Sequence, residues 1–84
     1  MDKDFVTALI INVIQHSDSI PSKLKNECAS NPDPSDVILR LSSLEFIDLI
    51  LVVETALGAN FSEKMLIANS VSIKELAERI SRLV

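Results

Sequence analysis

The sequence predicts a single all-α domain, because its apolar residues recur at helical spacing and few residues interrupt that pattern. The chain has 84 residues, of which 48% are hydrophobic, with one Gly and three Pro. No segment alternates between polar and apolar residues as a half-buried strand does. We therefore expect residues 1–84 to form one bundle of three main helices and a short fourth, with a long first loop.

The first helix is expected over residues 4–15, with one apolar stripe toward the core. Asp2 and Asp4 suit its N-terminus, where negative charge interacts favourably with the helix dipole. Pro21 supports a break after this helix. The stripe consists of Phe5, Val6, Leu9, Ile10 and Val13.

A long mixed segment follows from Ser17 to Leu41. Residues 21–29 are expected to form a short helix, whereas residues 31–35 contain two prolines and are expected to be non-helical. The end of the segment is apolar and should pack on the core. The residues expected to do so are Val37, Ile38, Leu39 and Leu41.

The second main helix is expected to begin at Ser42 or Ser43 and to end near Gly58. Ser42 and Glu45 have the spacing of a capping box, in which each residue satisfies a backbone N–H of the other. Gly58 is suited to the left-handed conformation that commonly ends a helix.

Two further helices are expected after this one. A short helix is predicted over residues 62–68. The last helix opens at Ser72, which has Glu75 at capping-box spacing. Its apolar stripe consists of Ile73, Leu76, Ala77, Ile80 and Leu83.

The second main helix has two apolar sides, although a helix in a small bundle needs only one. A second apolar surface bordered by acids is typical of a transient docking site. The alternative is that the helix is buried nearly all round. The expected core side consists of Phe46, Leu49, Ile50, Val53, Ala56 and Leu57, and the opposite side of Leu44, Ile47, Asp48, Leu51, Glu54 and Thr55.

Composition argues against several classes of function. The net charge is −4, from 12 acidic and 8 basic residues, which disfavours binding to nucleic acid. The longest apolar stretch, residues 46–53, is broken by an aspartate and is too short to span a membrane. His16 and Cys28 are the only residues of their kinds, so neither a metal cluster nor a nucleophile–base pair is evident. We expect a cytoplasmic, non-enzymatic protein that binds neither nucleic acid nor membrane.

Residues 43–54 resemble the start of the second helix of acyl and peptidyl carrier proteins, which an Asp-Ser-Leu signature opens, and the likeness runs without gaps from Ser42 to about Phe61. The segment reads Ser43-Leu44-Glu45-Phe46-Ile47-Asp48-Leu49-Ile50-Leu51. Residues 72–80 resemble the family's final helix, and the first helix and loop agree in length and order.

The resemblance implies that Ser43 carries 4′-phosphopantetheine, attached by a phosphopantetheinyl transferase from coenzyme A. The arm would hold a thioester-linked acyl or aminoacyl group, loaded by a ligase and passed to enzymes of fatty-acid, polyketide, nonribosomal-peptide or other specialised biosynthesis. A monomer is the family expectation. The residues implied in docking are Leu44, Glu45, Ile47, Asp48, Leu51 and Glu54.

Other interpretations stay open at this point. Ser43 could be an ordinary N-cap, and the carboxylates could be a solvated helix face. The family usually has Asp before its serine, where this chain has Ser42. That departure favours a second hypothesis, an unmodified carrier-like adapter that docks partners through Leu44, Ile47 and Leu51.

Overall fold

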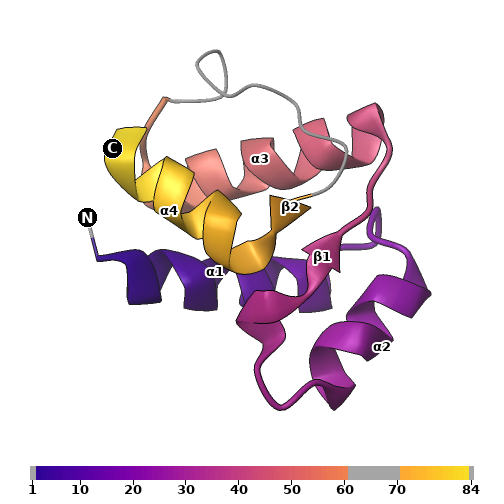
Figure 1. Cartoon of the computed structure of the whole chain (residues 1–84). Helices are drawn as coiled ribbons and strands as arrows, with labels where there is room; N and C mark the ends of the chain where they lie inside the picture. The colour runs from indigo at the N-terminus through magenta and orange to yellow at the C-terminus, as the bar shows by residue number, and fades with distance from the viewer. Residues whose placement is uncertain (1, 61–70, 84) are drawn as a thin grey trace.

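The computed structural model describes residues 2–60 and 71–83, and it confirms the all-α class (Figure 1). Within these ranges the elements follow the order α1, α2, a 3₁₀ turn, β1, α3, β2 and α4. The short helix expected over residues 62–68 lies outside the described residues. The bounds are α1 Lys3–His16, α2 Ser22–Ser30, η1 Pro34–Asp36, β1 Ile38–Leu39, α3 Ser43–Leu57, β2 Val71–Ser72 and α4 Ile73–Leu83.

Helix α1 forms close to the expected bounds. The Asp2 side chain accepts a hydrogen bond from the Asp4 backbone N–H at 2.9 Å and so caps the helix. Its buried side chains recur at helical spacing and contact α3 and α4. They are Val6, Ile10, Val13 and Ile14.

The inclusion of Phe5 in the core stripe was wrong, since this side chain is 58% exposed. At about 100° per residue, Phe5 lies about 125° around the axis from the centre of the buried stripe. Leu9 is nearer to that centre and packs against the core while half-buried. Phe5 therefore lies outside the stripe and stays in solvent.

The predicted short helix is present as α2, which buries Leu24 and Cys28 one turn apart. A 3₁₀ turn follows, in which the Asp33 carboxylate accepts a hydrogen bond from the Ser35 backbone N–H at 3.3 Å. The loop is thus structured over much of its length, as long loops in compact domains commonly are.

Strands β1 and β2 form one antiparallel pair that the sequence did not predict. Ile38 is opposite Ser72 and Leu39 is opposite Val71, and the Ile73 N–H donates to the Val37 carbonyl at 3.1 Å. The pair joins the segment before α3 to the start of α4 (Figure 1). Strands of two residues are too short to show the alternation by which a strand is found in a sequence.

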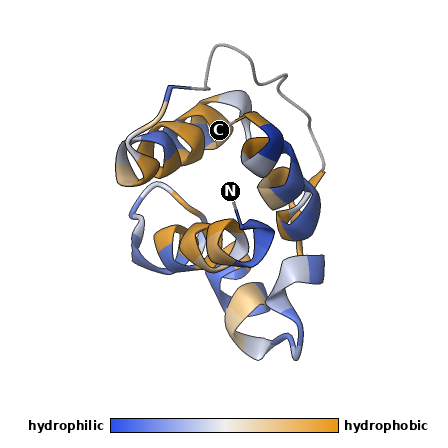
Figure 2. Ribbon diagram, turned by 90° about the vertical axis from the view of Figure 1, so that its left-hand side faces the viewer, coloured by the Kyte–Doolittle hydropathy of each residue, from blue (hydrophilic) through white to orange (hydrophobic). Residues whose placement is uncertain are grey.

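The core lies where α1, α3 and α4 meet. Four of the six residues predicted to face the core from α3 are buried, and so are four of the five predicted from α4. Figure 2 shows the hydrophobic sides of the helices turned toward the middle of the molecule. The buried residues of α3 are Phe46, Leu49, Ile50 and Val53, and those of α4 are Ile73, Leu76, Ala77 and Ile80.

Leu39 and Ile38 are neighbours with opposite environments, and substitutions there test the strand's packing. Leu39 is fully buried, so Leu39→Ala is expected to destabilise the protein by about 2–5 kcal/mol through the cavity it leaves. Ile38 is 38% exposed, so Ile38→Ala should cost about 1 kcal/mol or less. Urea denaturation followed by circular dichroism measures both, and equal losses would contradict the structure.

Candidate functional site

The N-terminus of α3 carries a complete capping box. The Ser42 Oγ accepts a hydrogen bond from the Glu45 backbone N–H at 3.2 Å, and the Glu45 Oε1 accepts one from the Ser42 backbone N–H at 2.9 Å. Ser42 is therefore the N-cap, as its spacing to Glu45 predicted.

This arrangement leaves Ser43 without a capping role. Ser43 is the first residue of α3, it is exposed, and its hydroxyl makes no hydrogen bond within residues 2–60 and 71–83. The ordinary reason for a serine at a helix start, which is to cap it, is met by Ser42. Ser43 is thus an exposed serine whose hydroxyl is bonded to none of the described residues.

The backbone next to Ser43 suits an anion. The N–H groups of Ser43 and Leu44 lie in the first turn, where no earlier helical carbonyl is available, and neither bonds to another described residue. Together with the positive end of the helix dipole, these donors favour a phosphate group. The structure around Ser43 therefore fits a phosphodiester on its hydroxyl.

The side of α3 that faces away from the core carries large apolar side chains. Leu44 is 79% exposed, and Leu51 and Val52 are each nearly half exposed. Val52 was not among the expected docking residues, although it lies one residue from Leu51 on the same exposed side. We name this surface the outer face, and its apolar residues are Leu44, Ile47, Leu51 and Val52.

Part of the outer face is slightly hollowed. An open depression there is lined by residues of α3 alone. The residues that line this depression are Asp48, Leu51, Val52, Thr55 and Ala56.

Ala56 was expected in the core but is exposed, because it lies about 70° from the centre of the buried side and in the last turn of α3.

The three predicted docking carboxylates have different surroundings. Asp48 is exposed and lies on the outer face. Glu45 is exposed in part, and one of its oxygens belongs to the capping box. Glu54 is half-buried. Asp48 is thus the carboxylate most accessible to a partner, whereas Glu45 also stabilises the N-terminus of α3 through the capping box.

The single histidine and cysteine lie apart from this site. The His16 ring bonds to the Asn12 carbonyl at 2.9 Å at the end of α1. Cys28 is 2% exposed, and burial together with the nearby Glu27 carboxylate raises the pKa of its thiol. A buried thiol with a raised pKa is a poor nucleophile. Among the described residues, no group of three or more His, Cys, Asp or Glu is placed to hold a metal ion.

Comparisons with protein-family models, with curated proteins and with solved structures gave no match. Within the described ranges, no helix has the length and apolar character needed to cross a membrane.

Substitution of the two adjacent serines separates their roles. Ser42→Ala removes the cap of α3 and is expected to cost about 1 kcal/mol of stability. Ser43→Ala removes only a solvated hydroxyl, so its effect should be within about 0.5 kcal/mol. Thermal and urea denaturation of the two variants measure this difference. A larger loss for Ser43→Ala than for Ser42→Ala would contradict the assignment of the cap.

Proposed function

We propose that this chain is a stand-alone carrier protein that holds a thioester-linked acyl or aminoacyl group on a 4′-phosphopantetheine arm at Ser43. The observation that carries the proposal is that the adjacent residues Ser42 and Ser43 have different hydrogen bonding. Ser42 completes the capping box, whereas Ser43 at the helix start is exposed and its hydroxyl bonds to no residue in the described part of the chain. An exposed serine that does not cap its own helix is suited to modification at the helix N-terminus.

The residues at the start of α3 would hold the phosphate end of the arm. The N–H groups of Ser43 and Leu44 would donate to the phosphodiester oxygens, and Leu44 would lie beside the arm as it leaves the helix. When bound, the arm supplies a terminal thiol that carries cargo as a thioester. Attachment needs no base on this chain, because a separate transferase would activate the Ser43 hydroxyl.

The attachment step balances with coenzyme A as the donor. A bond forms between the Ser43 Oγ and the phosphorus that bears pantetheine, and the pyrophosphate P–O bond breaks. Adenosine 3′,5′-bisphosphate leaves, and the hydroxyl proton passes to the transferase or to solvent. The exposure of Ser43 allows a second protein to reach it.

The outer face of α3 would provide the docking surface for the transferase, the loading ligase and downstream enzymes. Ile47 and Leu51 supply apolar contacts, and Asp48 lies between them in sequence and is exposed. Charged residues at a docking surface mainly accelerate encounter and select partners, which suits a carrier that must leave each enzyme quickly. Basic surfaces on the partners would complement this acidic chain, whose net charge is −4.

Intact-mass measurement tests the modification directly. Incubation with coenzyme A, magnesium and a broad-specificity phosphopantetheinyl transferase is expected to add one phosphopantetheine to the protein. Ser43→Ala should abolish the gain in mass completely. Ser42→Ala is the matched control and should still be modified, at a temperature where it stays folded.

Peptide mapping then locates the adduct. An adduct on a residue other than Ser43, or no adduct with either of two unrelated transferases, would overturn the carrier proposal.

An unmodified adapter is the second candidate, and the exposed outer face favours it independently of Ser43. Four large apolar side chains on one helix face are available for docking whether or not an arm is attached. The adapter would bind partners by burying these side chains and would need no hydroxyl at position 43.

Ile47→Glu and Ser43→Ala distinguish the two functions. In a carrier, Ile47→Glu is expected to slow modification at least about tenfold, because it places a charge in the apolar part of the docking surface. The measurement is the initial rate of the mass gain, with Ala8→Glu on the exposed side of α1 as the control. An adapter would instead bind a partner equally well with Ser43→Ala and lose it with Ile47→Glu.

A further inference from the structure

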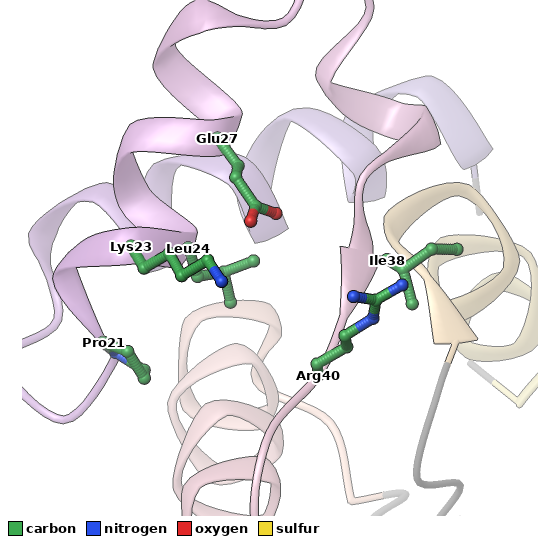
Figure 3. A pocket seen from close by; sticks show the side chains of 6 residues that line it. All are labelled: Pro21, Lys23, Leu24, Glu27, Ile38 and Arg40. Carbon is green, nitrogen blue, oxygen red and sulfur yellow. The ribbon is translucent and has the colours of Figure 1, made fainter.

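A second concave site lies between α2 and β1, away from the outer face of α3 (Figure 3). Its volume is about 180 Å³, which corresponds to about six water molecules at their volume in the liquid. A small organic acid fits a space of this size. The lining residues are Pro21, Lys23, Leu24, Glu27, Ile38 and Arg40.

The charges around this pocket favour a monoanion. Figure 3 shows the Lys23 side chain entering the gap from α2 and the Arg40 guanidinium facing it from the end of β1, with Glu27 also turned toward the gap. Two cations and one carboxylate give the pocket a net charge of +1, in a chain whose net charge is −4. Within the described part of the chain, none of the three forms an ion pair.

The backbone of α2 adds further attraction for an anion. The cap position is Pro21, and it contributes no side-chain hydrogen bond to the helix N-terminus. The N–H groups of Ser22 and Lys23 bond to no other described residue, and Pro21 and Lys23 both line the pocket. An uncapped helix start therefore borders the cavity, beside two cationic side chains.

The pocket also has an apolar part. Leu24 and Ile38 line it from the two sides, and Ile38 is 38% exposed although it belongs to a strand. A short aliphatic chain would cover these side chains while its charged end meets Lys23 and Arg40. This combination distinguishes an organic acid from an inorganic anion.

We propose that this pocket binds the free carboxylate of the cargo, so that the carrier takes the monothioester of a small dicarboxylic acid. The proposal rests on the proposed function for the tether. Arg40 precedes Ser43 by three residues, so the two positions lie at most about 10 Å apart along the chain. An extended pantetheine arm is longer than this span, and it can fold back so that its cargo enters the pocket.

Loading two matched cargos tests the tethered form. The transferase would load Ser43 from succinyl-coenzyme A or from 4-methylpentanoyl-coenzyme A, whose branched end has the shape of the carboxylate without its charge. Only the succinyl form is expected to shift the amide NMR signals of residues 22–24 and 38–40. Arg40→Gln should remove that difference, and Lys25→Gln, which removes a cation of α2 outside the pocket, should preserve it.

A second experiment uses the unmodified protein and free succinamate, a small carboxylate with an uncharged amide at its other end. Titration by NMR is expected to shift the same amides, and Arg40→Gln or Lys23→Gln should weaken binding about fivefold or more. Glu27→Gln should strengthen it, because a like charge is removed.

The outcomes separate the two proposals. If Ser43 is never modified, the carrier function fails while the succinamate titration still tests the pocket. Binding of free succinamate without a succinyl-specific shift would overturn the assignment to tethered cargo. Identical shifts from both loaded forms, together with no succinamate binding, would overturn the pocket itself.

Discussion

The burial of alternate side chains along residues 37–41 is the constraint on which both candidate sites depend. Val37, Leu39 and Leu41 enter the core, whereas Ile38 and Arg40 point outward. The antiparallel pairing with β2 and the bond from the Ile73 N–H to the Val37 carbonyl hold the same segment from the other side. Since α3 begins directly afterwards, this anchoring fixes where Ser43 emerges and which side chains form one wall of the pocket.

Ser42 and Ser43 have two roles that one serine could not fill at once, namely capping α3 and offering a hydroxyl for modification. A serine that caps a helix uses its oxygen to accept a backbone N–H, and that oxygen is then less available for chemistry. Ser42 takes this task, and Glu45 completes the reciprocal bond. One residue later, the Ser43 hydroxyl bonds to no residue within ranges 2–60 and 71–83 and lies next to backbone donors that suit a phosphate.

The helices could be predicted from the sequence because the signals that define them are local. The apolar periodicity of α1 and α4, the capping boxes and Gly58 each lie within one turn of the structure they determine. Gly58 does have the positive φ, 66°, that ends α3. The outer face of α3 could be predicted for the same reason, since the helical spacing of residues 44–57 alone separates two apolar sides.

Features that depend on contacts between distant segments could not be predicted. Residues 37–41 form a nearly continuous apolar run in the sequence, broken only by Arg40. The expectation that Ile38 packs on the core was therefore wrong, since its side chain is 38% exposed in the paired strand. The pocket has the same origin, since Lys23 and Arg40 belong to different segments that the fold brings face to face. In the sequence, Lys23 and Arg40 lie 17 positions apart, so no local pattern places them in one site.

Local charge, rather than net charge, decides what each surface attracts. An acidic chain repels anions at long range, but salt limits that effect to about 8–10 Å under ordinary conditions. Within this distance a ligand in the pocket meets Lys23, Arg40 and Glu27, which line it. The pocket and the outer face are separate surfaces with no lining residue in common. Such a carrier would present the carboxylates of α3 to its partner enzymes and, at the same time, bind its cargo through the cations of the pocket.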